Sequence, residues 1–541
     1  MYRRKLERHL SQSIDEPMIN LVSAVVAAQA GNASALQAVA DLPPEALGAK
    51  LGSPYHIPLW MLETLVNELL ATPKAKGLGV ARTRLLRTDS FGTLRALQSI
   101  LINLENAEDG IFLERHDVFY EMARIAQRQF PWQRGVANGP HIYRSVLLYG
   151  SGSAKEFFEA DLGISVADFI KTGVCMYGGL ARADFVPRER DLSKVNISPE
   201  VREAALARIC VDLAEARRLA ASMRRHKRHT GYSPSLMRDY PIIAFGEGGQ
   251  RLRSPIPQLI MYRYTSGLYL DVVKGGPSVW TGIGKRFEGY VLEYLQAMMD
   301  EHTVTPEIEY GPKKSRYRTP DILVSKGPAV VAVVECKAKR MSFDARYADD
   351  PVAAASVGFE ELAKGIFQIW RFFAHARKAV AGAPVLAANC QGIIATADSW
   401  LAMASNQAED VIANAHALAD AEGGIEPEDR REIAFCQIED IEFALQTGDG
   451  DSFLTACREI ASGPKKGFML SVAHAASKGL ERPFPFRDRM HELLPWIEDP
   501  QSELTRRAGI CRVALRSNPD TDLQNQSTRS GNQPPFEPAE D

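Results

Sequence analysis

The chain lacks the features that mark several common protein classes. Its 541 residues include only seven cysteines, with no CxxC pair and none placed with histidines at zinc-binding spacing. A structural zinc site is therefore not expected, and an odd, unpatterned set of thiols is typical of a cytoplasmic protein. No apolar run approaches the length that spans a bilayer, and the charged N-terminus lacks a following apolar core of signal-peptide length. We expect no contact with a membrane.

The near-neutral charge and the absence of a phosphate-binding loop argue against further classes of function. The formal net charge is −3, so nucleic-acid contact would have to come from local patches rather than an overall basic field. No GxxxxGK[ST] loop is present, which argues against a nucleotide-driven motor. With 45% hydrophobic and 24% charged residues, the chain is long enough for about two to four domains with cores of their own.

Residues 1–240 predict an almost wholly helical region. The segment IPLWMLETLVNELLA repeats apolar residues at three- and four-residue steps, which is typical of an amphipathic helix. Ser198-Pro199-Glu200 is a helix start, and the helix is expected to continue as far as Lys227. We expect an accessory or regulatory role for this region, such as sensing, guiding a substrate, homo-oligomerisation or binding a partner protein.

A basic run, RRHKRH at residues 224–229, follows in this region. One interpretation is a segment that contacts phosphates beside a catalytic domain. The other, which we favour slightly, is a helix C-terminus whose cations suit the helix dipole. His226 and His229 have no nearby carboxylate or third ligand that would complete a metal site.

The sequence changes character after Tyr240. PIIAF and QLIMYRYTSGLYLDVV are apolar and rich in β-prone residues, which favours strands or an extended packing arm. A helix around FEGYVLEYLQAMM then presents Glu288 at the edge of its apolar face. VTPEIEY predicts a short strand after this helix.

Three polar residues stand at the ends of a predicted apolar hairpin. Asp321 follows Pro320 and starts the strand DILV, whereas AVVAVVECKAK is a near-continuous apolar run that ends in Glu335-Cys336-Lys337. Strand alternation places Glu335 and Lys337 on one side of the sheet and Cys336 on the other. Glu335 lies fourteen positions after Asp321, enough for a strand, a turn and the return strand, so the two carboxylates can meet.

This pattern suits hydrolysis of a phosphodiester with a divalent metal. Such a reaction needs charge neutralisation on the phosphate and a deprotonated water, and hard oxygen ligands holding Mg²⁺ supply both. Asp321, Glu335 and the backbone carbonyl of Cys336 are the expected ligands, and Mn²⁺ is expected to substitute. Lys337 would orient the attacking water or stabilise negative charge near the scissile phosphate.

A basic segment precedes Asp321 and forms the expected nucleic-acid contact. GPKKSRYRTP interleaves cations with Tyr317, which fits contact with a sugar–phosphate backbone, although an exposed hairpin loop is an equally good interpretation of this segment alone. Lys339 and Arg340, directly after the apolar strand, are assigned to the same contact. The residues predicted to bind nucleic acid are Lys313, Lys314, Arg316, Arg318, Lys339 and Arg340.

In order and context, these motifs resemble the PD-(D/E)xK nuclease superfamily. The resemblance implies a restriction-endonuclease-like fold, in which a mixed sheet flanked by helices carries the Asp on its second strand and E-x-K on its third. It adds Glu288 from the preceding helix and Gln368 from the following helix, a glutamine common in the RecB-like and Holliday-junction-resolvase-like branches. The implied catalytic set is Glu288, Asp321, Glu335, Lys337 and Gln368.

The expected fold class is therefore α+β and multidomain. An all-α region at residues 1–240 precedes a nuclease domain at 241–450, whose core spans 282–445 and includes later strands in GIIATADSW and AFCQIEDIEFAL. Helices are expected at 451–515, and the polar, proline-rich segment 516–541 is expected to be disordered.

The expected function is that of a Mg²⁺-dependent deoxyribonuclease, cutting internally or from ends, in microbial defence or DNA repair. DNA is favoured over RNA as the partner. The alternatives are a catalytically silent nuclease fold that binds nucleic acid or assembles with other subunits, and a ribonuclease.

Overall fold

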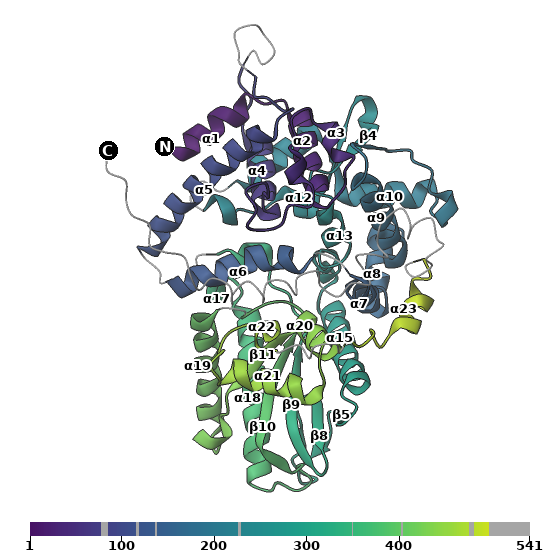
Figure 1. Cartoon of the computed structure of the whole chain (residues 1–541). Coiled ribbons are helices and arrows are strands. Elements are labelled where there is room, and N and C mark those ends of the chain that lie inside the picture. Colours follow the sequence, from purple (N-terminus) through teal and green to yellow (C-terminus); the bar gives the residue numbers. More distant parts are fainter. Residues whose placement is uncertain are drawn as a thin grey trace.

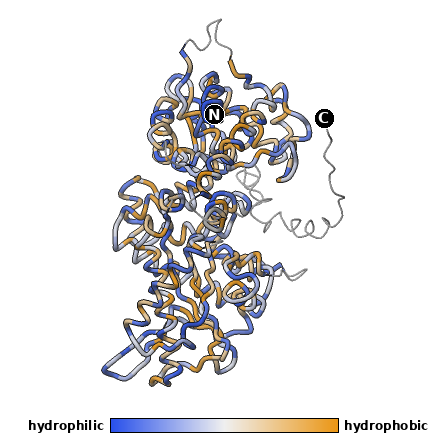
Figure 2. The backbone as a smooth tube through the Cα atoms, turned by 90° about the vertical axis from the view of Figure 1, so that its left-hand side faces the viewer, coloured by the Kyte–Doolittle hydropathy of each residue, from blue (hydrophilic) through white to orange (hydrophobic). Residues whose placement is uncertain are grey.

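The computed structural model describes residues 1–76, 85–114, 118–135, 138–224, 229–348, 350–401, 404–474 and 481–496. It is a mixed α/β protein with helices at both ends, which agrees with the α+β, multidomain class expected from the sequence. Figure 1 shows a largely helical upper part and a lower part built on a sheet. Figure 2 shows this elongated arrangement from the side, with apolar segments in both parts. Residues 225–228 of the basic run and the segment 516–541 lie outside the described residues.

Helices dominate the first 240 residues, as predicted. Ser198 caps α10 as its sequence context predicts, because its side chain accepts a hydrogen bond from the backbone N–H of Val201. The helices are α1 (Tyr2–Ser11), α2 (Asp15–Gln29), α3 (Ala35–Ala38), α4 (Leu59–Ala71), α5 (Phe91–Leu113), α6 (Val118–Arg134), α7 (Gly139–Tyr149), α8 (Gly152–Leu162), α9 (Val166–Leu180), α10 (Pro199–Ile209), α11 (Leu213–Met223) and α12 (Leu236–Asp239).

The expectation of one continuous helix from Pro199 to Lys227 is wrong. Cys210–Asp212 forms strand β2, which separates α10 from α11 and pairs in parallel with β3 (Ile242–Phe245). Asp212 then caps α11 by accepting from the backbone N–H of Glu215, so a capping signal inside the apparent helix marks the break. A small sheet in the order β1-β4-β3-β2 results, with β1 (Val186–Pro187) and β4 (Arg251–Arg253) at one side.

The apolar segment 258–273 is helical rather than extended, which corrects its predicted strand or arm. It forms α13 (Gln258–Tyr264) and α14 (Leu268–Val272). A short apolar run carries no periodicity that separates a buried helix from a strand, and tertiary packing decides here. Tyr264 packs on Phe169 of α9 with ring centroids 4.2 Å apart. The neighbouring prediction for PIIAF is confirmed, because that segment supplies β3.

The larger sheet has the strand order β11-β10-β9-β8-β5. Strands β9, β10 and β11 are parallel, and β8 runs antiparallel to both β9 and β5. The predicted short strand, hairpin and later core strands are all present. Their bounds are β5 (Thr303–Pro306), β8 (Ile322–Lys326), β9 (Ala329–Lys337), β10 (Leu386–Thr396) and β11 (Ile433–Gln437).

Helices cover both faces of this sheet. Val334 of β9 shares a core with Tyr294 of α15 (Pro277–Met298), whereas Val333 shares one with Ile366 of α18 (Ser356–Arg377). Alternate residues of β9 therefore face opposite helices, as strand geometry requires. Helix α19 (Ser405–Glu422) packs beside α18. The remaining helices are α16 (Phe343–Arg346), α17 (Pro351–Ala354), α20 (Ile438–Gln446), α21 (Gly450–Ala461), α22 (Leu470–Ala473) and α23 (Arg487–Leu493).

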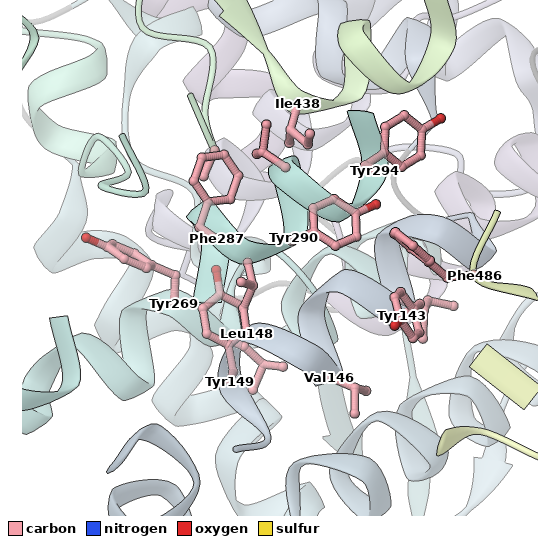
Figure 3. Close-up of a cluster of buried hydrophobic side chains, with 14 of the residues drawn as sticks. Tyr143, Val146, Leu148, Tyr149, Tyr269, Phe287, Tyr290, Tyr294, Ile438 and Phe486 are labelled. Atoms are coloured by element: carbon pink, nitrogen blue, oxygen red, sulfur yellow. The ribbon is translucent and has the colours of Figure 1, made fainter. Parts of the chain in front are cut away.

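The helical part and the sheet are joined through a shared apolar core. Figure 3 shows Tyr143 of α7 and Phe486 beside Tyr290 of α15; both Tyr143 and Tyr290 lie within 6 Å of the Phe486 ring. At the same place Arg144 forms ion pairs with Glu439 and Glu442 of α20. The described helices include none long and apolar enough to cross a lipid bilayer.

Candidate functional site

The pairing of β8 with β9 places Asp321 beside the end of β9. Ile322 is the register partner of Val334, so Asp321, directly before β8, lies next to the last residues of the neighbouring strand. Its Oδ2 accepts a hydrogen bond of 2.7 Å from the backbone N–H of Cys336. The predicted meeting of Asp321 with the Glu335–Lys337 segment is therefore present.

Glu335 and Lys337 lie together on the α18 face of the sheet. The Lys337 Nζ donates to Glu335 Oε1 at 2.8 Å. With its amide in the orientation that satisfies its neighbours, Gln368 of α18 also donates to this oxygen, at 3.1 Å. Glu335 is only 3% exposed, and its other oxygen, Oε2, is buried without a hydrogen-bond partner among the described residues.

The carboxylates near this point repel one another. Burial, followed by the negative charge of Glu335, raises the pKa of Asp321 to about 7. Burial and then the charges of Asp321 and Glu307 raise the pKa of Glu288, which places Glu288 of α15 within the electrostatic reach of the site. Glu307 was missed by sequence reasoning; its position directly after the strand β5, like that of Asp321 before β8, is the signal that identifies it.

Lys337 remains charged despite its surroundings. Burial alone lowers the pKa of an ammonium group, but the charges of Glu335 and Asp321 more than offset burial and leave the Lys337 pKa above its ordinary value. The neighbouring thiol has the opposite character, because burial and then the Asp321 charge raise the pKa of Cys336 well above its usual range. Cys336 thus offers the site a backbone carbonyl and not a thiolate.

Helix α18 approaches the site closely at a glycine. A Cβ added to Gly365 would meet Lys337 Cε at 3.0 Å and Glu335 Cγ at 3.2 Å. Any larger residue would displace the two side chains whose positions matter here. Sequence reasoning missed Gly365, although an isolated glycine inside a predicted helix is a signal of close packing.

Three of the predicted nucleic-acid-binding residues are exposed on one loop. Lys313, Lys314 and Arg316 lie between β6 (Glu309–Tyr310) and β7 (Tyr317–Arg318), and each is exposed. Tyr317 is not free to stack on a base, because its ring packs 4.3 Å from that of His375.

The other three predicted contact residues are engaged elsewhere. Arg318 pairs with Glu307 at 3.0 Å, and Lys339 pairs with Glu361 at 2.9 Å. Arg340 lines a cavity between the sheet and the helical part and is not exposed on an open surface.

The oxygen donors at this site fit a hard divalent cation with water completing its shell. Within the described ranges, no group of three or more His, Cys, Asp or Glu side chains is arranged to hold a metal ion. Mg²⁺, however, is commonly held by one or two protein carboxylates together with water and substrate oxygens. The unpartnered Glu335 Oε2 and the neighbouring Asp321 carboxylate meet this smaller requirement.

The arrangement combines two adjacent carboxylates, a charged lysine and a glutamine that holds one of the carboxylates in place. Such a set of side chains can bind a cation and polarise a water molecule beside an anionic substrate. Comparison of the chain with models of known protein families, with curated proteins and with solved structures finds no match.

Proposed function

We propose that this chain is a Mg²⁺-dependent nuclease of the PD-(D/E)xK type that hydrolyses phosphodiester bonds of DNA. The observation that carries the proposal is the meeting of Asp321 and Glu335, with Glu335 Oε2 buried and unpartnered. A buried carboxylate oxygen without a donor is unfavourable by several kcal/mol, on the order of the value for an unsatisfied charged group. A bound cation would remove this penalty.

The topology of the sheet supports a restriction-endonuclease-like fold. Strands β5, β8 and β9 are the first three of the larger sheet in chain order. Asp321 directly precedes the second of these strands, and Glu335 and Lys337 lie on the third. This placement matches the one implied by the superfamily resemblance.

Asp321, Glu335 and the backbone carbonyl of Cys336 would hold the metal. Bound Mg²⁺ would supply charge neutralisation on the phosphate and would make a coordinated water more acidic. Gln368 holds Glu335 Oε1 in place, and Oε2 has no hydrogen-bond partner among the described residues.

Lys337 would act on the substrate. It keeps its positive charge at neutral pH, and its ammonium lies 2.8 Å from Glu335 Oε1, at the position where the phosphate would approach the carboxylates. Removal of one preorganised electrostatic donor from an active site typically lowers kcat by about 10²–10³-fold. Glu288 adds a further carboxylate near the site, whose pKa burial and the charge of Asp321 raise.

The exposed cations Lys313, Lys314 and Arg316 would bind the nucleic-acid backbone. Their contribution is independent of base sequence, so the structure supports the substrate class and not a recognition sequence. A role in microbial defence or DNA repair is proposed on the resemblance alone.

The test is a cleavage assay on circular and linear DNA and on RNA, each with Mg²⁺, Mn²⁺ or EDTA. We expect metal-dependent cleavage of DNA, and cutting of circular DNA would identify an endonuclease. Lys337→Met should lower the rate by at least about 100-fold. Lys326→Met is the matched control. Lys326 is at the other end of β8 from Asp321, and its ammonium pairs with Asp451 at a distance of 2.6 Å.

Absence of cleavage with either metal on every substrate would contradict the enzymatic proposal and favour a silent nucleic-acid-binding subunit. Faster cleavage of RNA than of DNA would reassign the substrate. Unchanged cleavage by Lys337→Met would contradict the site assignment only.

A further inference from the structure

We propose that the cavity between the helical part and the larger sheet binds a small phosphorylated ligand of the nucleoside-phosphate class. Its volume is about 360 Å³, which lies within the range of small-molecule sites. The lining comes from both parts of the protein: from the end of α11, from residues 234–239, from α13 and α14, and from the segments that follow β9 and β10. This binding site is separate from the carboxylates of the proposed nuclease centre.

Three residues that line this cavity each carry a buried polar atom without a hydrogen-bond partner in the described structure. Arg340 Nε, Arg346 Nε and Ser235 Oγ are each buried and have no hydrogen-bond partner in the described structure. Buried donors are nearly always satisfied in folded proteins, and these three would gain a partner if their side chains turned toward a ligand in the cavity. Two of the three belong to guanidinium groups, which bind phosphate oxygens particularly well.

The charges around the cavity leave Arg340 as its anion-binding group. Arg238 is neutralised by a two-point ion pair with Glu63, and Arg346 is paired with Asp398. Arg340, in contrast, forms no ion pair with any carboxylate in the part of the chain that the structure describes. Burial alone would lower its pKa, but interaction with the Tyr149 hydroxyl and the charge of Asp398 leave the pKa above its ordinary value, so Arg340 stays charged.

The other groups that line the cavity favour a ligand with an anionic end and hydrogen-bond donors elsewhere over a simple polyanion. Asp239 and Asp344 also line the cavity, and these carboxylates would repel an anion that filled all of it. They would accept hydrogen bonds from amino or hydroxyl groups at the other end of a ligand. Tyr262 and Tyr269 add aromatic surface on which a flat ring packs well. A phosphate joined to a sugar and a base has all of these properties.

Binding is tested on the full chain in EDTA, without nucleic acid, so that the result does not depend on cleavage. Isothermal titration calorimetry uses AMP, GMP, CMP and UMP as probes, with the matching nucleosides and inorganic phosphate for comparison. We expect at least one nucleoside monophosphate to bind at least ten-fold more tightly than its nucleoside and than inorganic phosphate. Failure of all four monophosphates to bind at millimolar concentration would overturn the proposal.

Two variants locate the site. Arg340→Gln should weaken binding by about ten- to one-hundred-fold, the range expected when a charge-assisted hydrogen bond is lost. Ser222→Trp reduces the space from an exposed position on the last turn of α11 and leaves every buried charge in place, so it tests the cavity even if Arg340→Gln fails to fold. Arg87→Gln is the control, because Arg87 is 64% exposed, pairs with Asp89 and does not line the cavity. Wild-type affinity in both cavity variants would overturn the assignment of the site.

Discussion

Replacement of Asp321 by Asn should stabilise the metal-free protein while abolishing cleavage. In the folded protein, burial and the charge of Glu335 raise the pKa of Asp321 from 3.8 to about 7. A shift of about three pH units corresponds to roughly 4 kcal/mol, and relaxation of the neighbouring groups reduces this to roughly 2–4 kcal/mol at pH 8. Asn carries no charge, and its side-chain oxygen can still accept the hydrogen bond from the Cys336 N–H.

The pH dependence of this effect has a definite sign. A carboxyl whose folded pKa is raised favours the folded state fully below its unfolded pKa, and that contribution is lost as pH rises from about 4 through about 7. The stability gap between Asp321→Asn and wild type should therefore be about 1–3 kcal/mol at pH 8, after allowance for burial of the amide. It should fall below about 1 kcal/mol at pH 4.5.

Urea unfolding in EDTA at the two pH values measures this gap. Mg²⁺ at pH 8 should then stabilise wild type, by about 2.7 kcal/mol at a concentration of one hundred times Kd, and leave the variant unchanged. Asp300→Asn is the control, because Asp300 is 70% exposed and pairs with Arg482, so its effect should stay within about 0.5 kcal/mol. A lower urea midpoint for Asp321→Asn than for wild type at pH 8 in EDTA would refute the reasoning.

Three further predictions test the surroundings of the site. Gly365→Val should lower kcat by at least about ten-fold, because its side chain would displace Lys337 and Glu335, the proposed catalytic residues. Gly289→Ala, where an added Cβ meets nothing within 4 Å, should leave kcat unchanged. Arg144→Met should lower the free energy of unfolding by about 3–5 kcal/mol in a urea titration, since it leaves Glu442 buried and unpaired; an effect below about 1 kcal/mol would contradict this. Replacement of the three exposed cations of the β6–β7 loop by Gln should reduce the slope of log Kobs against log salt by about 2–3 in fluorescence anisotropy, and an unchanged slope would place the nucleic acid elsewhere.

The elements of the larger sheet could be predicted from the sequence because their patterns are local. An apolar run ending in Glu335-Cys336-Lys337 specifies a buried strand and the side on which its polar residues lie, and β9 has this arrangement. The helix start at Ser198 is equally local. The proposed chemistry of the site rests on the same short patterns and stays a prediction.

Features that depend on long-range packing could not be predicted in this way. The break at Cys210–Asp212 forms because a distant strand, β3, pairs with it, and residues 258–264 are helical because of what packs around them. Arg340 was assigned to an open basic surface, and its position in a cavity depends on helices encoded far upstream. Charge alone does not reveal whether an arginine faces solvent or another part of the chain.

The division of apolar side chains among the cores has a consequence for synthesis on the ribosome. One hydrophobic core of the helical part combines side chains from Leu6–Leu104 with others from Ala216–Leu259. More than a hundred residues lie between these two segments. At a synthesis rate of about 5–20 residues per second, the side chains from Leu6–Leu104 lack the other side chains of this core for on the order of 5–20 s. Most of the buried apolar residues in between belong to a core that is complete only when Leu494 has emerged. A growing chain that ends near residue 240 therefore exposes two incomplete apolar surfaces at once, and this is the stage at which we expect a chaperone to bind it.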